Sequence, residues 1–200
     1  MQSANIKPLY RQKAVTLVEL LVVIAIIGII SSIAIPSYRS FVITNRISSF
    51  STNLHGSLLL ARTEAIKRSQ PVVICKSNNV DAAAPICDRT ASANSVNVGW
   101  GSGWLIFVDN DGDNLFVAPN LLIRVQTNFI PMITDGSIVP TKQDGSASDE
   151  FVRFNATGQP DKAINFIINR PAGDADVSHD RAVCVVVGGR ARVGRTPDCS

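Results

Sequence analysis

The stretch Lys13-Ala-Val-Thr-Leu-Val-Glu-Leu-Leu-Val-Val-Ile-Ala-Ile-Ile-Gly-Ile-Ile-Ser-Ser-Ile-Ala-Ile-Pro36 decides how the rest of the chain is organised. From Val15 to Ile35 it contains 21 residues, of which only Glu19 is ionisable. A helix of this length spans about 30 Å, which is enough to cross the hydrocarbon core of a bilayer. The sequence therefore predicts a single membrane-spanning helix near the N-terminus.

Glu19 is the anomaly in this run, because an acidic residue at the centre of a membrane helix costs roughly 2.5–3.5 kcal/mol. Spacing alone leaves two readings open: a functional carboxylate, or one near enough to the membrane edge to reach the headgroups. A secretory signal peptide is a third reading, for which Ser31, Ser32 and Ala34 imitate a cleavage site. Its apolar region would span only about 7–15 residues without an acid, so we favour the membrane helix.

The basic residues of the first 14 positions account for the net charge of the chain. Lys7, Arg11 and Lys13 lie there without an acid, and the formal net charge is +3. By the positive-inside rule these residues place the N-terminus in the cytoplasm and the domain that follows in the periplasm. The remaining residues are balanced at 16 basic and 16 acidic, so the total charge does not favour nucleic-acid binding.

Four cysteines follow the apolar run: Cys75, Cys87, Cys184 and Cys199. An even number beyond a membrane segment indicates an oxidising compartment and disulfide bonds. The sequence allows three pairings, and pairing by nearness joins Cys75 to Cys87 and Cys184 to Cys199. A zinc site is the alternative, but spacings of 11 and 14 intervening residues are unlike the short knuckles that zinc uses.

The segment Thr16–Gly28, together with the short basic leader and Pro36, resembles the class III leader of type IV pilins and pseudopilins. The resemblance implies that a prepilin peptidase cleaves between Ala14 and Val15 and that the new N-terminus at Val15 is methylated. It also implies that Glu19 pairs with the N-terminal amine of a neighbouring pilin, which compensates for a carboxylate in lipid. Ala14 and Val15 stand where the family usually has Gly and Phe.

Beyond Pro36, which should bend the helix, apolar residues recur mostly at three- or four-residue steps. They are Phe41, Ile47, Phe50, Leu54, Leu58, Ala61 and Ala65. We expect one amphipathic helix that reaches about Arg68, ends before Pro71 and packs against a sheet through this stripe.

From Pro71 onward the pattern changes to short apolar runs separated by turn residues, which is typical of strands. The expected strands are Val72–Cys75, Trp104–Val108, Leu121–Ile130, Phe151–Phe154, Ile164–Ile168 and Ala182–Val187. Asp109–Asp113 reads as a hairpin turn rather than a calcium loop, because Gly and Glu are missing from the positions an EF-hand requires. We expect Trp100 and Trp104 to pack beside this turn.

Neither histidine lies in a catalytic or metal-binding pattern, and the sequence has no nucleophile motif and no phosphate loop. The sequence therefore predicts no enzyme activity, no cofactor and no metal site.

Between Arg181 and Arg195 there are four arginines and no acid. In an extended chain Arg190 and Arg192 point to the same face, and guanidinium groups there suit phosphate oxygens. Gly188 and Gly189 allow a turn before them, and a bridge from Cys184 to Cys199 would hold the whole segment as an ordered loop. The alternative is a solvated edge strand whose charges resist aggregation.

These features together resemble the FimT/GspH family of minor pseudopilins, with Thr63–Arg68, Gly103–Asp109, Cys184 and Gly189–Arg192 as the matching segments. The resemblance implies an α+β, pilin-like fold, in which a long N-terminal helix packs against an antiparallel β-rich domain. In the FimT branch a Gly-Arg-x-Arg motif is associated with binding double-stranded DNA during natural transformation. It matches Gly189, Arg190 and Arg192, to which our own reading adds Arg195 and Arg181.

The expected organisation has four segments: a cleaved leader (1–14), a transmembrane helix (15–36), an amphipathic extension (37–70) and a β-rich periplasmic domain (71–200). The expected function is that of a minor type IV pilin that binds DNA independently of sequence for uptake. Its partners would be other pilins, the prepilin peptidase and the inner membrane, with a place in the pilus after assembly. The alternative is a purely structural subunit that primes a type IV pilus or a type II secretion pseudopilus.

Overall fold

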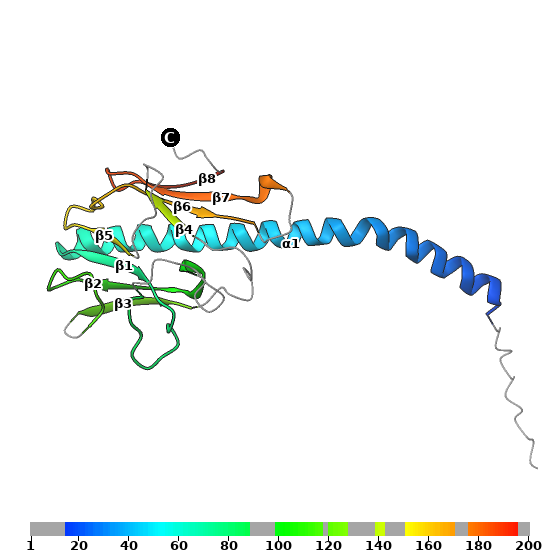
Figure 1. Cartoon of the computed structure of the whole chain (residues 1–200), viewed down its shortest axis with the longest axis horizontal. Coiled ribbons are helices and arrows are strands. Elements are labelled where there is room, and N and C mark those ends of the chain that lie inside the picture. The colour runs from blue at the N-terminus through cyan, green and yellow to red at the C-terminus, as the bar shows by residue number, and fades with distance from the viewer. Residues whose placement is uncertain are drawn as a thin grey trace, which may run out of the picture. The chain divides into compact units, whose positions relative to one another are not determined.

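The computed structural model describes residues 15–88, 99–117, 120–127, 139–142, 151–170 and 176–195. The chain separates into two compact units, Met1–Phe41 and Val42–Ser200. Helix α1 (Leu17–Arg68) begins in the first unit, and the second unit contains its C-terminal half and all the strands (Figure 1).

In the first unit, α1 has exposed apolar side chains on every side. By length and composition it is the one helix in the described ranges that could cross a membrane, and none of its most apolar 18-residue window is buried. Thr16 begins the helix, because its Oγ1 accepts a hydrogen bond from the Glu19 backbone N–H at 3.2 Å. The helix continues through Pro36.

In the second unit, α1 buries one stripe. The buried apolar side chains, at three- or four-residue steps, are Ile47, Phe50, Leu54, Leu58, Ala61 and Ala65. Phe41, which we expected in this stripe, is 64% exposed and belongs to the first unit. The helix ends at Arg68, as predicted, because Ser69 takes a left-handed conformation (φ 54°) just before Pro71.

Within the described ranges, the strands form two antiparallel sheets. The first has the order β3 (Leu121–Gln126), β2 (Trp104–Val108), β1 (Val72–Lys76) and β5 (Phe151–Phe154). The second has the order β4 (Val139–Lys142), β6 (Ile164–Ile168), β7 (Arg181–Val185) and β8 (Ala191–Arg195). Short 3-10 helices precede β2 and β7 among the described residues: η1 (Trp100–Ser102) and η3 (Val177–His179).

Two predicted strands were too long and two observed strands were missed. The strand expected to reach Ile130 ends at Gln126, and the one expected to reach Val187 ends at Val185, where the chain turns. β4 was missed because Pro140 lies inside it, which a strand tolerates at the edge of a sheet. β8 was not among the expected strands, because arginine and glycine dilute its apolar pattern. It appeared only in the alternative reading, as a solvated edge strand, and β8 does lie at the edge of the second sheet.

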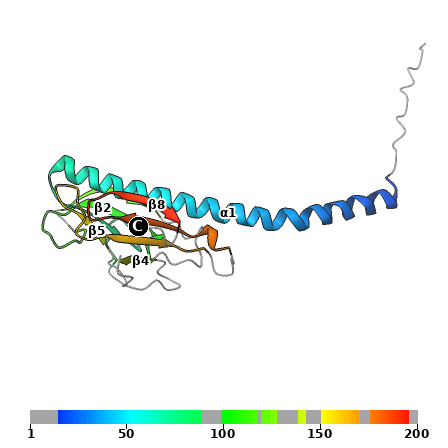
Figure 2. The same ribbon diagram turned by 90° about the horizontal axis from the view of Figure 1, so that it is seen from above.

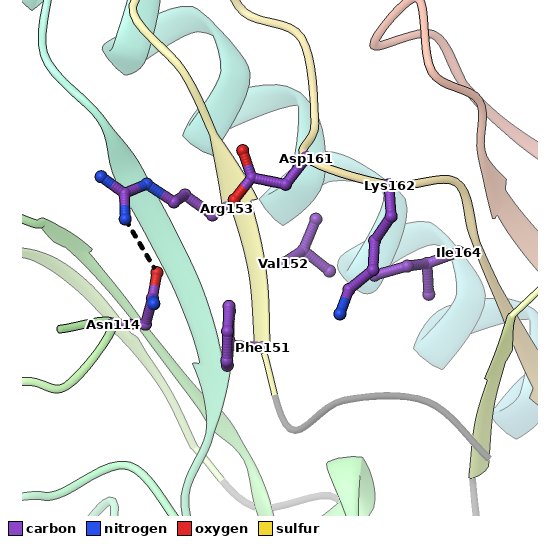
Figure 3. Close-up of a pocket in the computed structure, with 7 residues that line it drawn as sticks. All are labelled: Asn114, Phe151, Val152, Arg153, Asp161, Lys162 and Ile164. Atoms are coloured by element: carbon purple, nitrogen blue, oxygen red, sulfur yellow. Dashed lines mark hydrogen bonds between the residues drawn. The ribbon is translucent and has the colours of Figure 1, made fainter. Parts of the chain in front are cut away.

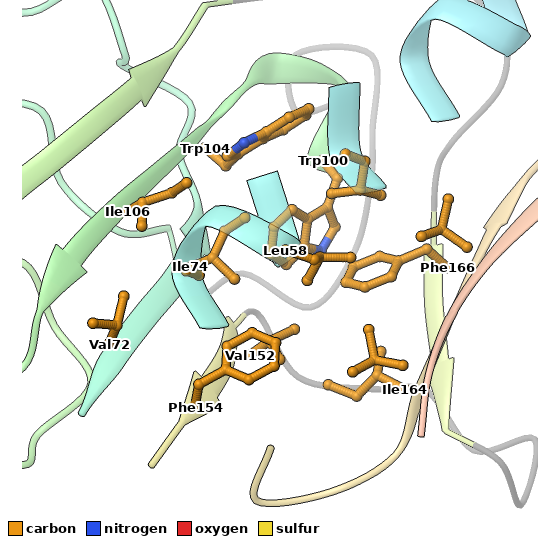
Figure 4. Close-up of a cluster of buried hydrophobic side chains, with 14 of the residues drawn as sticks. Leu58, Val72, Ile74, Trp100, Trp104, Ile106, Val152, Phe154, Ile164 and Phe166 are labelled. Atoms are coloured by element: carbon orange, nitrogen blue, oxygen red, sulfur yellow. The ribbon is translucent and has the colours of Figure 1, made fainter. Parts of the chain in front are cut away.

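The main core lies between α1 and the strands of both sheets (Figure 4). Trp100 packs edge-on against Phe166, and Trp104 packs edge-on against Phe50 of α1. The prediction that the two tryptophans lie beside the Asp109–Asp113 turn was wrong, because Trp104 begins β2 and Asp109 follows its other end. These side chains are therefore structural.

A second cluster covers the other face of the first sheet, around Val73, Leu105 and Phe107. A disulfide joins Cys75 of β1 to Cys87 and closes the loop over this cluster, with a Cα–Cα distance of 5.6 Å. This is one of the two bonds that pairing by nearness predicts. The buried strands β1 and β2 therefore have apolar neighbours on both faces.

Candidate functional site

The β7–β8 hairpin carries the predicted Gly-Arg-x-Arg segment. Its loop is short: the Gly189 N–H donates to the Val186 carbonyl at 2.7 Å, and the Val186 N–H donates to the Arg190 carbonyl at 3.1 Å. Gly189 has φ +77°, and a Cβ at this position would overlap the carbonyl oxygen of Gly158. Only glycine therefore fits the third position of this loop.

The strand register assigns each arginine to a face of the sheet. Val183 and Val185 of β7 are buried in the core, and their Cα partners in β8 are Val193 and Ala191. Arg192 is paired with Cys184, whose side chain points to the opposite face. Arg190, two residues earlier, comes just before β8, and its carbonyl accepts the Val186 N–H. Both arginine side chains are exposed. The alternation of an extended chain favours the same face for Arg190 and Arg192, and their sharing of one face stays a prediction.

Arg181 and Arg195 lie on the other face of the hairpin. They are Cα partners directly opposite one another, in register with the buried Val183 side of the sheet. The guanidinium of Arg181 donates to the carbonyls of Ser178 and Asp180 at 2.6 and 2.9 Å, whereas the Arg195 side chain is exposed. The register therefore assigns Arg192 to one face and Arg181 and Arg195 to the other, because Arg192 and Arg195 are an odd number of residues apart.

Helix α1 contacts the outer edge of this hairpin (Figure 2). The Arg62 guanidinium donates to the Gly189 carbonyl at 2.7 Å, and the His55 Nε2 lies 3.2 Å from the Ala191 carbonyl oxygen. Sequence reasoning missed both residues, because their seven-residue spacing on α1 has no meaning until β8 lies alongside the helix.

Cys184, opposite Arg192, is disulfide-bonded. Its expected partner, Cys199, lies outside the described residues. Ala14 of the expected cleavage site is also outside them. Val15 and Glu19 lie four residues apart at the exposed start of the first unit, where the Glu19 N–H donates to the Thr16 Oγ1.

The turn after β2 gathers three carboxylates, of Asp109, Asp111 and Asp113, whose oxygens lie within 4.8 Å of one another. The Asp109 carboxylate accepts the Gly112 N–H at 3.0 Å and lies 3.1 Å from the Arg153 guanidinium of β5. Burial raises the pKa of Asp109, and the positive charge of Arg153 partly opposes that rise. These contacts close the turn that the sequence predicted.

A cavity of about 110 Å³ lies beside Arg153, with Phe151, Asp161 and Lys162 on its walls (Figure 3). The Arg153 guanidinium is bonded to Asn114 at 3.2 Å, and the Lys162 ammonium lies 5.7 Å from the centre of the Phe151 ring. The two cationic groups of this cavity, Arg153 and Lys162, are therefore engaged with neighbouring protein groups rather than directed together at a ligand.

Residues 51–189 match the family of the type II transport protein GspH, and residues 9–35 match the prokaryotic N-terminal methylation motif. A segment of 37 residues is 49% identical to the type IV major fimbrial protein FimA of Dichelobacter nodosus, over 18% of this chain and 24% of FimA. The chain thus covers only about a quarter of the length of this curated relative.

The structure is similar to the crystal structure of the type IV minor pilin FimU of Pseudomonas aeruginosa. The TM-score is 0.50 and the identity is 19%, over 75% of this chain and 89% of FimU. At this identity the similarity concerns the fold alone, and the predicted pilin-like fold is confirmed.

Proposed function

The chain belongs to the GspH family and is a membrane-anchored minor pseudopilin of the type IV pilin type, and from this premise we propose that it binds double-stranded DNA. The binding residues would be Arg190 and Arg192, with Gly189 as the turn that presents them. Arg195 and Arg181 would add weaker contacts at the margin of the DNA-binding surface. The role in the cell would be DNA uptake during natural transformation.

The observation that carries this proposal is the exposure of the Arg190 and Arg192 side chains on the β7–β8 hairpin. The register assigns Arg192 to the outer face, Arg190 lies two residues before it, and within the described ranges no carboxylate forms an ion pair with Arg190. Side chains at this spacing are about 7 Å apart, close to the separation of successive phosphates along a DNA strand. Each guanidinium offers a planar donor fork to phosphate oxygens.

In the alternative reading, these arginines are charges that prevent the exposed edge of β8 from pairing with another strand. This role is less needed, because α1 already contacts part of that edge. The outward carbonyls of Gly189 and Ala191 are already bonded by Arg62 and contacted by His55 of α1. This part of β8 does not offer a row of unpaired groups to another strand. A role for the arginines outside the protein is therefore the better account.

The N-terminal part supplies the anchor and the assembly device. The methylation motif implies processing by a prepilin peptidase and assembly with other pilins. We propose cleavage between Ala14 and Val15, methylation of Val15, and pairing of Glu19 with the N-terminal amine of a neighbouring subunit. The basic leader would remain in the cytoplasm, the domain would lie in the periplasm, and the assembled subunit would present the hairpin from a pilus.

DNA binding by two to four arginines should be weak, independent of sequence and sensitive to salt. We expect a slope of about −2 to −4 in a plot of log affinity against log salt concentration. The test uses the full chain in micelles of an uncharged detergent, with fluorescence anisotropy on two unrelated duplexes of equal length. Arg190→Gln with Arg192→Gln should lower affinity by about tenfold or more and reduce the slope by about 2.

The matched control is Arg46→Gln with Arg124→Gln, which removes the same charge from two exposed positions elsewhere in the second unit. This control should change affinity by less than about twofold. Equal losses in the two double variants would show a general charge effect and would contradict the proposed site. Thermal unfolding should be the same for all three chains.

The match to a type II transport protein favours one other candidate: a structural subunit that primes a type IV pilus or a secretion pseudopilus. Deletion in the host separates the two. Loss of DNA uptake with normal piliation supports the DNA receptor, whereas loss of pili or of protein secretion supports the assembly factor.

A further inference from the structure

The Arg62 side chain of α1 runs across two glycine turns, one from each sheet. The first turn ends at Gly158 after β5, where the Gly158 N–H donates to the Asn155 carbonyl at 2.8 Å. A Cβ on Gly158 would lie 3.1 Å from the Arg62 Cγ and 2.6 Å from the Ile66 Cδ1. A Cβ on Gly189 would lie 3.1 Å from the Arg62 Cζ and Nε. The aliphatic stem of Arg62 thus covers Gly158, and its guanidinium covers Gly189.

The hydrogen bond from this guanidinium determines the direction of the peptide unit between Gly189 and Arg190. The Arg62 Nη1 donates to the Gly189 carbonyl at 2.7 Å, and the Arg190 carbonyl accepts the Val186 N–H at 3.1 Å. Both peptide units that flank the Arg190 Cα are therefore held, one by α1 and one by β7. Since the direction of the Cα–Cβ bond follows from these two units, the exposed Arg190 side chain leaves the hairpin in a defined direction.

We infer that Arg62 is a positioning residue for the DNA-binding pair Arg190 and Arg192, an inference that rests on the proposed function. Arg62 is half-buried, and its guanidinium is used inside the protein. Arg62 orders the hairpin before DNA binds, so the entropy cost of ordering the hairpin does not reduce the binding free energy. His55, which contacts the Ala191 carbonyl, supports the next part of β8 in the same way.

A positioning arginine and a phosphate-binding arginine differ in their salt dependence. Loss of a phosphate contact lowers the salt slope by about 1. Loss of order in the hairpin leaves the number of phosphate contacts unchanged and weakens binding at every salt concentration alike. For two arginines that must be ordered on binding, we expect a loss of roughly 3- to 10-fold in affinity.

The test compares Arg62→Met, Arg62→Lys and the control Arg46→Met in the full chain in uncharged detergent micelles. Arg62→Met keeps the apolar stem over Gly158 and removes the donor, and Arg62→Lys restores a donor and the charge. Arg46→Met removes the same charge from an exposed position of the same helix. DNA affinity is measured from about 50 to 200 mM salt, and hydrogen exchange is measured at the amides of Val186 and Gly189.

We expect Arg62→Met to bind DNA roughly 3- to 10-fold more weakly with an unchanged salt slope. The Val186 and Gly189 amides should exchange faster, while the amides of β1 keep the wild-type rate, which shows that the domain is folded. Arg62→Lys should recover part of the affinity, and Arg46→Met should match the wild type. Added to Arg190→Gln with Arg192→Gln, Arg62→Met should cause no further loss.

Unchanged affinity and unchanged exchange in Arg62→Met would overturn the inference while the proposed function stands. A salt slope reduced by about 1 would overturn it in another way, by making Arg62 a phosphate contact. If Arg190→Gln with Arg192→Gln binds DNA like the wild type, the proposed function fails and the inference fails with it.

Discussion

The first unit and the β7–β8 hairpin are built on opposite principles. In the first unit, none of the most apolar 18-residue stretch of α1 is buried. The apolar character of this part of the helix therefore depends only on its own residues. In the hairpin, Gly189 is confined by Gly158 and by Arg62, which lie 31 and 127 positions away in the chain. The comparison teaches that the anchor is a local property of the sequence, whereas the hairpin depends on contacts between distant segments. Substitutions of similar chemistry should therefore have very different effects in the two regions.

The largest difference is expected between two phenylalanines of the same helix. Phe50 is fully buried against Trp104, and Phe41 is 64% exposed in the first unit. Phe50→Ala should lower the free energy of unfolding of the second unit by about 4 kcal/mol, because it leaves a cavity in the main core. Phe41→Ala should change it by less than about 0.5 kcal/mol.

Both variants can be measured by urea unfolding of the full chain in micelles, followed by tryptophan fluorescence. Equal losses of stability would mean that the two units share one core, which would remove the basis of the comparison.

The second largest loss of unfolding free energy is expected for a glycine substitution. Gly189→Val should lower the free energy of unfolding by about 3 kcal/mol, because it combines a left-handed backbone with an overlap on the Gly158 carbonyl. Gly188→Ala and Gly28→Ala are the controls, since a Cβ at either position meets nothing within 4 Å. Both should stay within about 0.5 kcal/mol of the wild type for unfolding of the second unit.

The same unfolding measurement applies, with hydrogen exchange at the Val186 amide as a local readout. A stable Gly189→Val chain with a protected Val186 amide would show that the hairpin is not confined by Gly158.

A smaller difference is expected between two carboxylates. Asp109 is buried and paired with Arg153, whereas Glu19 is exposed at the start of α1. Arg153→Met should lower the free energy of unfolding by about 2 kcal/mol near neutral pH, because it leaves a buried carboxylate without its counter-charge. Glu19→Gln should leave the stability of the second unit unchanged.

The loss of unfolding free energy caused by Arg153→Met should depend on pH, and the direction of this dependence follows from the pKa of Asp109. Burial already raises the pKa of Asp109, and loss of Arg153 raises that pKa further. A carboxyl whose pKa is higher in the folded state lowers stability as pH rises through that pKa, since the folded protein must then lose the proton at a cost. The loss of unfolding free energy should therefore be largest at pH values above the Asp109 pKa, and it should decrease as the pH falls below that pKa. A deficit that grows on acidification would contradict this account.

Prediction from sequence succeeded where the pattern was local. Short apolar runs between turn residues identified β2, β5 and β6 with their observed bounds, and the three- or four-residue steps identified the buried half of α1. It failed where the decisive neighbour was distant. β4 carries a proline that only an edge position tolerates, and Trp100 and Trp104 pack against Phe166 and Phe50 rather than beside the turn after β2.

By itself, the sequence determined the apolar character of the first part of α1 and the burial of its second half, and it predicted the shared face of Arg190 and Arg192. Each of these follows from residue spacing within one helix or strand. Only the tertiary structure decided that Arg181 and Arg195 lie opposite one another across β7 and β8, that Gly189 must be glycine, and that Arg62 holds its carbonyl. The physical reason is that strand pairing and close backbone approach depend on which segments meet in the fold, and residue spacing carries no record of that.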